Sequence, residues 1–316
     1  MKILSLFDGI SGLQVALNNI GIKNYEYYAS ELDKYAIAVT QKNFPNTIQL
    51  GDVKNIIYAG RDNFGLLQYK NQCNTKCIKD IEGKIEIMCF GFPCQSFSIA
   101  GKQGGFSDDR GQLFFEALRI LKEVKPRFFI AENVASMKKP IQEEISQHLF
   151  GITPTLLNSA LLTAQTRKRI YWVGVLQKDG TYKKVEIEQP QDKGILLKDI
   201  LESGVAIKNK SNCITATYYK CSGMRDYLKG GRQIAVEPIR LGHYNKGGQG
   251  DRIYSIQGKS VCLSANGGGR GAKTGIYKID LQDGDYIVRK LTPKECARLQ
   301  GFPDNFCDNK IGRAHV

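Results

Sequence analysis

The chain has 316 residues, of which 42% are hydrophobic and 24% are charged, a composition that supports one large folded domain or two ordinary ones. No apolar run approaches the roughly 18–20 residues of a membrane-spanning helix. The first residues, MKILSLFDGISG, also lack the long apolar core of a signal peptide, so we expect a cytosolic protein. The formal net charge of +14 favours a polyanionic partner such as nucleic acid, because each neutralised phosphate releases counterions.

The nine cysteines are an odd number and are scattered along the chain. This pattern indicates a reducing compartment, where most thiols act as small apolar side chains. Cys73 and Cys77 have the spacing of a metal-binding pair, but no second pair follows and the chain has only three histidines. We therefore expect no metal site.

Short apolar segments alternate with helical patterns in the first half of the chain. We expect strands at 2–7, 25–30, 85–90, 128–131 and 169–175, and helices at 13–20, 33–43 and 111–124. Such alternation predicts an α/β fold whose mostly parallel sheet is covered on both faces.

The pattern changes near Leu176. From there to Val288 the chain is rich in glycine and short β-like pieces and has no long helical pattern, which predicts a second, smaller and loop-rich β domain. A helix is expected again from Thr292, because Thr-Pro-Lys-Glu supplies an N-cap, a proline at the first helical position and a capping-box glutamate, Glu295.

Three consecutive strand ends carry the residues of a candidate cofactor site. The first is the turn Phe7-Asp8-Gly9-Ile10-Ser11-Gly12, where glycine lets the backbone approach a ligand closely. Glu31 ends the second strand, 22 residues after Gly9, the separation expected for an acid that binds ribose hydroxyls. A third strand-like piece ends in Gly51-Asp52-Val53, where Asp52 could accept a hydrogen bond from an adenine amine. Together these features predict an adenosine-containing cofactor, whereas the missing G-x-G-x-x-G argues against a dinucleotide.

A candidate nucleophile follows the strand at 85–90. In Gly91-Phe92-Pro93-Cys94-Gln95-Ser96 the cysteine lies at a strand end in a turn fixed by proline, where a thiolate would be exposed. Cys89, inside the same apolar strand, has the position of a buried structural cysteine. The polar stretch 101–105 that follows suits a loop that closes over a substrate.

Two further motifs lie at ends of the expected strands. Glu132-Asn133-Val134 follows the strand at 128–131 and would place a carboxylate on the same edge of the sheet as Cys94, although a surface glutamate that caps a helix is the common alternative. Gln165-Thr166-Arg167-Lys168-Arg169 precedes the strand at 169–175. By itself such a basic run is usually a solvated face.

Taken in order, these motifs resemble those of the cytosine-C5 DNA methyltransferase family. The resemblance covers about residues 1–175 and 289–306 and rests on FDGISG, GFPCQSFS, DDRGQLFFEALRIL, ENV, QTRKR and RKLTPKECARLQGFP. The short region 136–163 is similar to the compact subclass of phage-type and animal de novo enzymes. The family implies a Rossmann-like methyltransferase sheet over 1–175, completed by 289–310, and a target-recognition domain over 176–288.

The family also implies a role for each motif. Cys94 would add to C6 of cytosine, so that C5 can attack the methylsulfonium of S-adenosyl-L-methionine. Glu132 would hydrogen-bond N3 and the exocyclic amine, and Arg167 and Arg169 would orient the base and help to keep the thiol ionised. Because a stacked base cannot reach such a site, the nucleotide must be flipped out of the duplex.

The remaining expectations concern ligands and partners. The residues expected to hold S-adenosyl-L-methionine are Phe7, Asp8, Gly9, Ser11, Gly12, Glu31, Leu32, Asp52, Val53 and Pro93. We expect a monomer that acts on duplex DNA in a bacterial or phage-infected cell, with a cognate restriction endonuclease as a candidate partner. Whether the enzyme is solitary and which sequence it methylates stay open; candidates for guanine contacts are Arg225, Arg232, Arg252 and Arg270.

Three other functions compete with this one. The same catalytic residues can methylate cytosine in tRNA, but the large segment 176–288 favours duplex DNA. A non-catalytic relative would be expected to lack Cys94, Glu132 or an arginine, and a nicotinamide oxidoreductase would need a more complete glycine motif.

The end of the chain departs from the family. After GFPDNF, members normally continue into a Gly-Asn-Ser/Ala-Val segment, whereas here CDNKIGRAHV follows. Because IGRAHV is also the translation of a common sequencing adapter, we hypothesise that residues 311–316 are a non-native tail on a truncated chain.

Overall fold

The computed structural model describes residues 1–61, 64–69, 81–93, 109–202, 205–206, 209–213, 234–243, 252–255, 276–278 and 285–306. Their contacts form two compact units. The first comprises 1–158 and 168–189, and the second comprises 159–167 and the described part of 190–308. No helix in the described residues is long and apolar enough to cross a bilayer.

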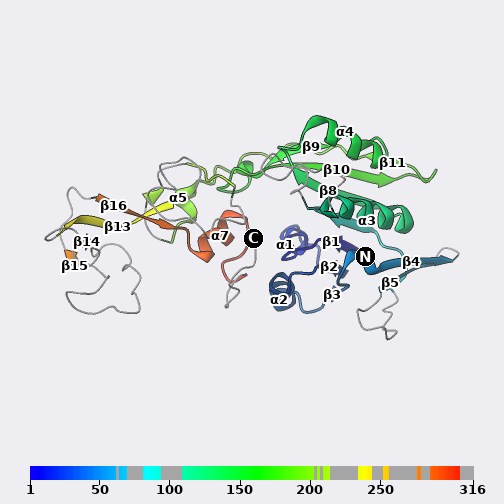
Figure 1. Ribbon diagram of the computed structural model, residues 1–316, viewed down its shortest axis with the longest axis horizontal. Helices are drawn as coiled ribbons and strands as arrows, with labels where there is room; N and C mark the ends of the chain where they lie inside the picture. Colours follow the sequence, from blue (N-terminus) through cyan, green and yellow to red (C-terminus); the bar gives the residue numbers. More distant parts are fainter. Residues whose placement is uncertain are drawn as a thin grey trace. The chain divides into compact units, whose positions relative to one another are not determined.

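A central sheet of eight described strands organises the first unit (Figure 1). Its order is β11 (Tyr182–Lys184), β10 (Lys168–Leu176), β8 (Phe128–Val134), β7 (Ile87–Phe90), β1 (Lys2–Leu6), β2 (Glu26–Ser30) and β3 (Ile48–Gln49), and β9 (Thr155–Asn158) pairs with β10. The neighbouring strands β3, β2, β1, β7 and β8 are parallel. β10 is antiparallel to β8, β9 and β11. The expected α/β fold with a mostly parallel sheet is thus confirmed, with an antiparallel edge.

Alternating side chains of the strands enter two different hydrophobic clusters, one on each face of the sheet. On β1, Leu4 and Leu6 pack in the larger cluster with residues of α3 (Asp109–Val124) and α4 (Lys139–His148), whereas Ile3 packs in a smaller cluster with Leu17 of α1 (Gly12–Asn19). This alternation follows from the two-residue period of a strand. Helices therefore cover both faces, as the sequence predicts.

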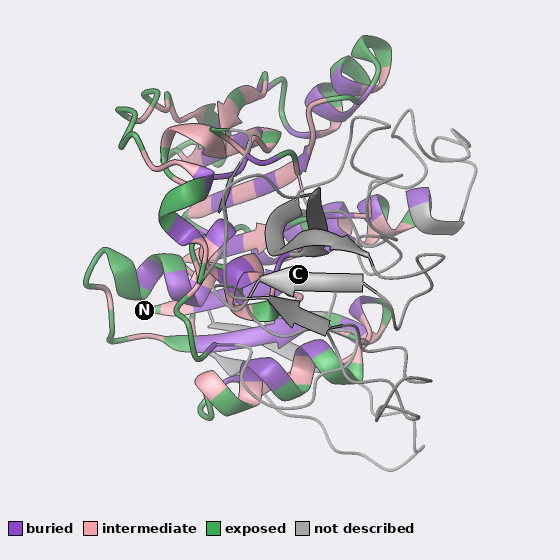
Figure 2. Ribbon diagram, turned by 90° about the vertical axis from the view of Figure 1, so that its left-hand side faces the viewer, coloured by how far each residue is buried: buried purple, intermediate pink, exposed green. Residues whose placement is uncertain are grey.

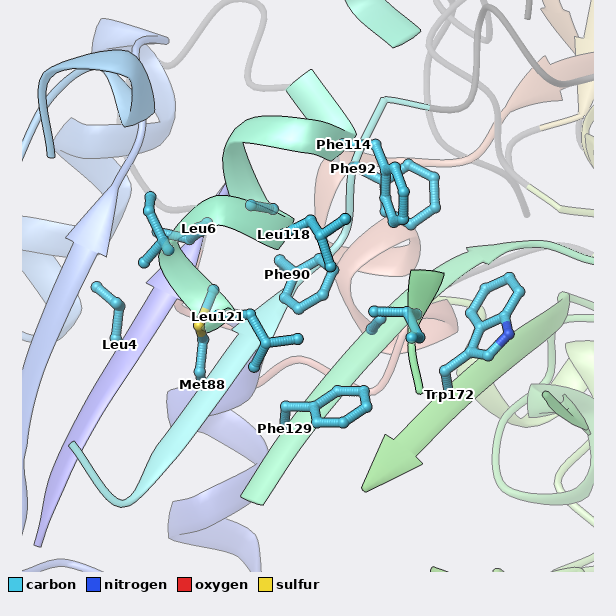
Figure 3. Packing of buried hydrophobic residues seen from close by; sticks show 14 of the residues in the cluster. Leu4, Leu6, Met88, Phe90, Phe92, Phe114, Leu118, Leu121, Phe129 and Trp172 are labelled. Carbon is cyan, nitrogen blue, oxygen red and sulfur yellow. The ribbon is translucent and has the colours of Figure 1, made fainter. Parts of the chain in front are cut away.

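The larger cluster is the main core of the first unit. Figure 3 shows Leu121 beside Met88 and Leu118 beside Phe90, and these residues are at least nine-tenths buried. Buried residues concentrate on the strands and on one side of the helices, as in an amphipathic pattern (Figure 2). Each fully buried leucine or phenylalanine contributes about 1.5–3 kcal/mol, so this cluster fixes the strand ends that carry the candidate site.

Several features of the first unit, including the edge strands β9 and β11, were not expected from the sequence. A small three-stranded sheet is formed by β4 (Ile56–Arg61), β5 (Phe64–Tyr69) and β6 (Ile81–Glu82), and α4 follows β8. Arg119 of α3 ties β4 to the core, because its Nη2 donates to the carbonyl oxygen of Ile56 at 2.9 Å. Cys73 and Cys77 lie outside the described residues.

Strand bounds also differ from the expected ones. β7 begins at Ile87 instead of 85, and β8 continues three residues beyond 131, so that Glu132, Asn133 and Val134 belong to the strand. The extension has a physical reason: β8 pairs with β10 along its whole length, as far as Val134 opposite Arg169.

The second unit contains a five-stranded sheet of described segments. Its strands are β12 (Val205–Ala206), β13 (Ile234–His243), β14 (Arg252–Ser255), β15 (Ile276–Lys278) and β16 (Asp285–Lys290). Its helices include the 3₁₀ turn η4 (Ser159–Leu161), α5 (Leu197–Ile200) and α7 (Pro293–Leu299). The capping box of α7 is confirmed, with Thr292 as N-cap and Glu295 bonding back to it.

The segment 291–306 packs within this second unit. Leu291 and Leu299 form a hydrophobic cluster with Leu197 and Ile200 of α5 and with Ala164. The contact-based units therefore divide the chain differently from the expected functional division, which stays a prediction. The expected tail at 311–316 lies outside the described residues.

Candidate functional site

A cavity of about 250 Å³ opens at the carboxyl ends of the parallel strands in the first unit. Its lining comes from the segments that follow β1, β2, β3 and β7, together with one residue of α3: Phe7, Ser30, Glu31, Leu32, Gly51, Asp52, Val53, Pro93 and Leu113. Ligands of open α/β sheets bind at this edge. Six of the ten residues expected to hold the cofactor therefore lie around one cavity: Phe7, Glu31, Leu32, Asp52, Val53 and Pro93.

Asp8, Gly9, Ser11 and Gly12 do not line this cavity but build the turn beside it. Phe7, Gly9 and Ser11 all have φ between 56° and 59°, a left-handed conformation that costs energy at the two non-glycine positions. The Asp8 side chain accepts hydrogen bonds from Ser11 Oγ and, at 2.7 Å, from the Tyr27 hydroxyl. Burial raises the pKa of Asp8, and nearby hydroxyl groups oppose this shift.

Glu31 is the most firmly held carboxylate of the cavity. One oxygen accepts from the Gly9 N–H at 2.7 Å, and the other accepts from the N–H groups of Leu32 at 2.7 Å and Asp33 at 2.9 Å. These bonds fix the rotamer of Glu31 and connect the end of β2 to the turn after β1. Asp52 is fixed in a similar way, because it caps the 3₁₀ turn η1 (Val53–Asn55) and accepts from the Lys54 N–H at 3.0 Å.

The segment after β7 is anchored from both sides. Phe92 is buried, and its ring packs against Phe114 of α3 with 5.0 Å between centroids. Its carbonyl oxygen accepts from Asn133 Nδ2 at 3.1 Å. The next residue, Pro93, lines the cavity, and Cys94 itself lies outside the described residues. The role of Asn133 was not foreseen, since the sequence shows only that it follows Glu132.

Glu132 and Arg169 form an ion pair between neighbouring strands. Glu132 Oε1 lies 2.8 Å from Arg169 Nε, and the two side chains are 31% and 16% exposed. Gly91 lies against this pair, because a Cβ there would come within 3.1 Å of Glu132 Oε2. Arg169 thus orients the Glu132 carboxylate, whose partly exposed side chain can still reach a ligand.

The other expected arginine lies in the second unit. Arg167 Nη1 is 3.3 Å from the Sγ atom of Cys213, and Arg167 ends the loop that begins at η4. The two arginines belong to different units. Arg169 pairs with Glu132 in the first unit, and Arg167 contacts Cys213 in the second.

Cys89 is half-buried, whereas the sequence predicts a buried structural cysteine. It lies in β7. Burial is the larger cause and the nearby Asp8 carboxylate the smaller cause that together raise the pKa of its thiol to about 12. Such a thiol stays protonated near neutral pH and is a poor nucleophile. In the described part of the chain, no three His, Cys, Asp or Glu side chains are grouped as metal ligands would be.

Comparison with known proteins identifies the family. The family described as C-5 cytosine-specific DNA methylase matches residues 1–311. The Type II methyltransferase M.HhaI of Haemophilus parahaemolyticus is 33% identical over 97% of this chain and 85% of its own. M.HpaII of Haemophilus parainfluenzae, also a Type II methyltransferase, is 31% identical over 96% and 80%.

A solved structure agrees on the fold. The Entamoeba histolytica methyltransferase EhMeth superimposes with a TM-score of 0.58 at 17% identity, over 99% of this chain and 89% of its own. The motifs, the sheet and the sequence relatives lead to one conclusion: the chain belongs to the C-5 cytosine-specific DNA methylases, enzymes that methylate carbon 5 of cytosine in DNA.

Proposed function

We propose that this enzyme takes the methyl group from S-adenosyl-L-methionine and places it on cytosine within a specific duplex DNA sequence, through a covalent adduct between Cys94 and a flipped-out base. We further propose that it works as a monomer in a bacterial or phage-infected cell.

The cavity fits the adenosine part of this cofactor. Apolar side chains of Phe7, Leu32 and Val53 surround a space with carboxylates at Glu31 and Asp52, which suits a flat base flanked by hydroxyl and amine donors. Glu31 would accept from the ribose hydroxyls and Asp52 from the adenine amine. When bound, S-adenosyl-L-methionine supplies an electrophilic methyl group.

The protein's own groups activate the cytosine, whose C5 is a weak nucleophile. Addition of the Cys94 thiolate to C6 forms a carbon–sulfur bond and moves electron density to C5. Glu132, held by Arg169, would accept from the exocyclic amine and share a proton with N3, which assists this addition. Arg167 and Arg169 would orient the base. After methylation, loss of the C5 proton restores the C5–C6 double bond and expels the thiolate.

One observation carries this proposal: Pro93, the residue before Cys94, lines the same cavity as Glu31 and Asp52. A methyl donor bound by those carboxylates would therefore lie beside the chain segment that holds the nucleophile. The Asn133 bond to the Phe92 carbonyl oxygen keeps that segment in place.

Trapping with 5-fluorocytosine tests the nucleophile. In duplex DNA that carries this base at the target site, the adduct cannot lose a C5 proton, so the protein–DNA complex should survive denaturing electrophoresis. We expect the complex with the unchanged enzyme and with Cys89→Ser, and no complex with Cys94→Ser. An adduct formed by Cys94→Ser would refute the assignment, and methyl transfer to tRNA in preference to DNA would refute the duplex substrate.

The biological partner can be tested separately. The relatives include Type II methyltransferases and the orphan methyltransferase M.Rho11sI of Bacillus phage rho11s. The Type II relatives support a cognate restriction endonuclease as partner. An endonuclease that cuts the unmethylated form of this enzyme's target sequence, and is blocked once the enzyme has methylated it, would establish the pairing.

A further inference from the structure

The loop 159–167 in the second unit ends at Arg167, one residue before β10 begins. Two bonds close the loop at its base. The Ser159 N–H donates to the Arg167 carbonyl oxygen at 3.1 Å, and Ser159 Oγ donates to the Gln165 carbonyl oxygen at 2.8 Å. These bonds join the two ends of the loop. A contact that holds the loop therefore also helps to hold the backbone of Arg167.

A segment distant in sequence, 209–213, runs along this loop. The Ser211 N–H donates to the Ala164 carbonyl oxygen at 2.7 Å, and the Thr166 N–H donates to the Ser211 carbonyl oxygen at 2.7 Å. These bonds make a parallel bridge between Gln165 and Ser211. Ser211 and Ala164 are fully buried, so water cannot replace the bonds if the segment shifts.

Lys210 holds the same loop through its side chain. Its Nζ donates to the carbonyl oxygens of Ala160 at 2.7 Å and Thr163 at 3.2 Å, and also to that of Ile195. Three carbonyl oxygens match the three donors of an ammonium group, and bonds from a charged donor are stronger than neutral ones. Lys210 therefore fixes the turn of the loop, while Ser211 fixes its return toward Arg167.

We propose that residues 209–213 form a clamp that positions Arg167 for catalysis, with Lys210 as its main positioning residue. The clamp reaches Arg167 directly as well, since the guanidinium lies 3.3 Å from Cys213 Sγ. It belongs to the region 176–288 that we predict reads the DNA sequence, so a recognition segment would hold a catalytic arginine. The proposal rests on the proposed role of Arg167.

A double-mutant cycle tests the clamp. The rate of methyl transfer from labelled S-adenosyl-L-methionine to duplex DNA is measured in a single turnover for the unchanged enzyme, Lys210→Met, Arg167→Ala and the double variant. Because small misplacements of a catalytic group are costly, we expect Lys210→Met to slow transfer by about 10- to 100-fold. In the Arg167→Ala background the same change should cost less than about twofold, since residues that act together are not additive.

The controls distinguish a loss of the clamp from a loss of folding, from a change of charge and from an error in the role given to Arg167. Lys198→Met removes an exposed cation of α5 and should leave the rate unchanged. Circular dichroism and a cooperative thermal unfolding transition verify that each variant is folded; if Lys210→Met is unfolded, the cycle is run with Lys210→Arg under the same criterion. An equal cost of the lysine change in both backgrounds, or no cost in the first, would overturn the clamp. A normal rate for Arg167→Ala would instead refute the role of Arg167.

Discussion

Glu31 organises the cavity at the residue scale, because its two oxygens accept from three backbone N–H groups on two loops. Glu31→Gln replaces one acceptor by an amide N–H₂ group that would face an N–H donor. We expect this change to weaken S-adenosyl-L-methionine binding by about 1–3 kcal/mol, because a bound ligand would cover the half-buried Glu31 and leave an unpaired polar group. Asp52→Ala should weaken it by a similar amount.

Calorimetry measures both effects. Asp33→Asn is the matched control, because it removes a charge from the same loop, keeps an oxygen that can cap α2 (Lys34–Asn43), and does not alter the lining of the cavity. Unchanged affinity for both Glu31→Gln and Asp52→Ala would remove these carboxylates from the cofactor site.

What the sequence can predict at this scale depends on distance along the chain. Glu31, Asp52 and Pro93 were predictable, since each follows a strand and parallel strands end at one edge. Asn133 was not, because its partner Phe92 lies 41 residues away and the bond depends on side chains across β7 and β8. The contacts of Asp8 with Ser11 of the turn and with Tyr27 of β2 could not be predicted either, and its contact with the cofactor stays a prediction.

At the scale of elements, strong local patterns were reliable. Five strands of the central sheet, β1, β2, β7, β8 and β10, and the helices α1, α2 and α3 lie within three residues of the expected bounds, because apolar periodicity is set by burial on both faces. The helix α4 was missed although Ile141, Ile145 and Leu149 carry a helical spacing. The small sheet of β4 to β6 could not be foreseen as readily, since its strands are short and depend on pairing with one another.

The helix α7 gives a prediction at this scale. Thr292 Oγ1 accepts from the Glu295 N–H at 3.1 Å, and the buried Glu295 returns a bond to the Thr292 N–H at 2.8 Å. Thr292→Val keeps the shape but removes the hydroxyl, so we expect the free energy of unfolding to fall by about 0.5–2 kcal/mol. Urea denaturation with an unchanged m-value measures the loss.

Lys294→Ala is the control for α7. The Lys294 ammonium lies 3.1 Å from Glu202 in a partly exposed ion pair, and such pairs contribute only about 0–1 kcal/mol. If Thr292→Val were no more destabilising than Lys294→Ala, the capping box would not stabilise this unit.

At the scale of the whole molecule, the boundary between chemistry and recognition is the least predictable feature. The composition changes near Leu176, yet β11 still pairs with β10 in the central sheet, and the Tyr182 hydroxyl donates to the Pro126 carbonyl oxygen at 2.6 Å. Composition reports local chain character, whereas a boundary depends on which surfaces pair. A chimera that exchanges the recognition region should therefore begin at residue 190, and it should end after Lys290, because β16 pairs with β13.

We predict that replacing 190–290 with the matching segment of a related enzyme changes the sequence that is methylated, while methylation still requires Cys94. Phosphate contacts position a protein and base contacts specify it, so the loops of this region should control sequence choice more than the chemical step. The candidate arginines of these loops, Arg225, Arg232, Arg252 and Arg270, have side chains outside the described residues. A donor segment with a lysine at the place of Lys210 would keep the proposed clamp.

Bisulfite sequencing of DNA from cells that express the chimera identifies the methylated sequence, and the same chimera with Cys94→Ser should leave the DNA unmethylated. A second chimera that begins at residue 177 is the control for the boundary: it replaces β11, loses the Tyr182 bond and should be less stable. If the first chimera were fully active but methylated the original sequence, the catalytic region would read the DNA, and 190–290 would serve only as a stabilising cover.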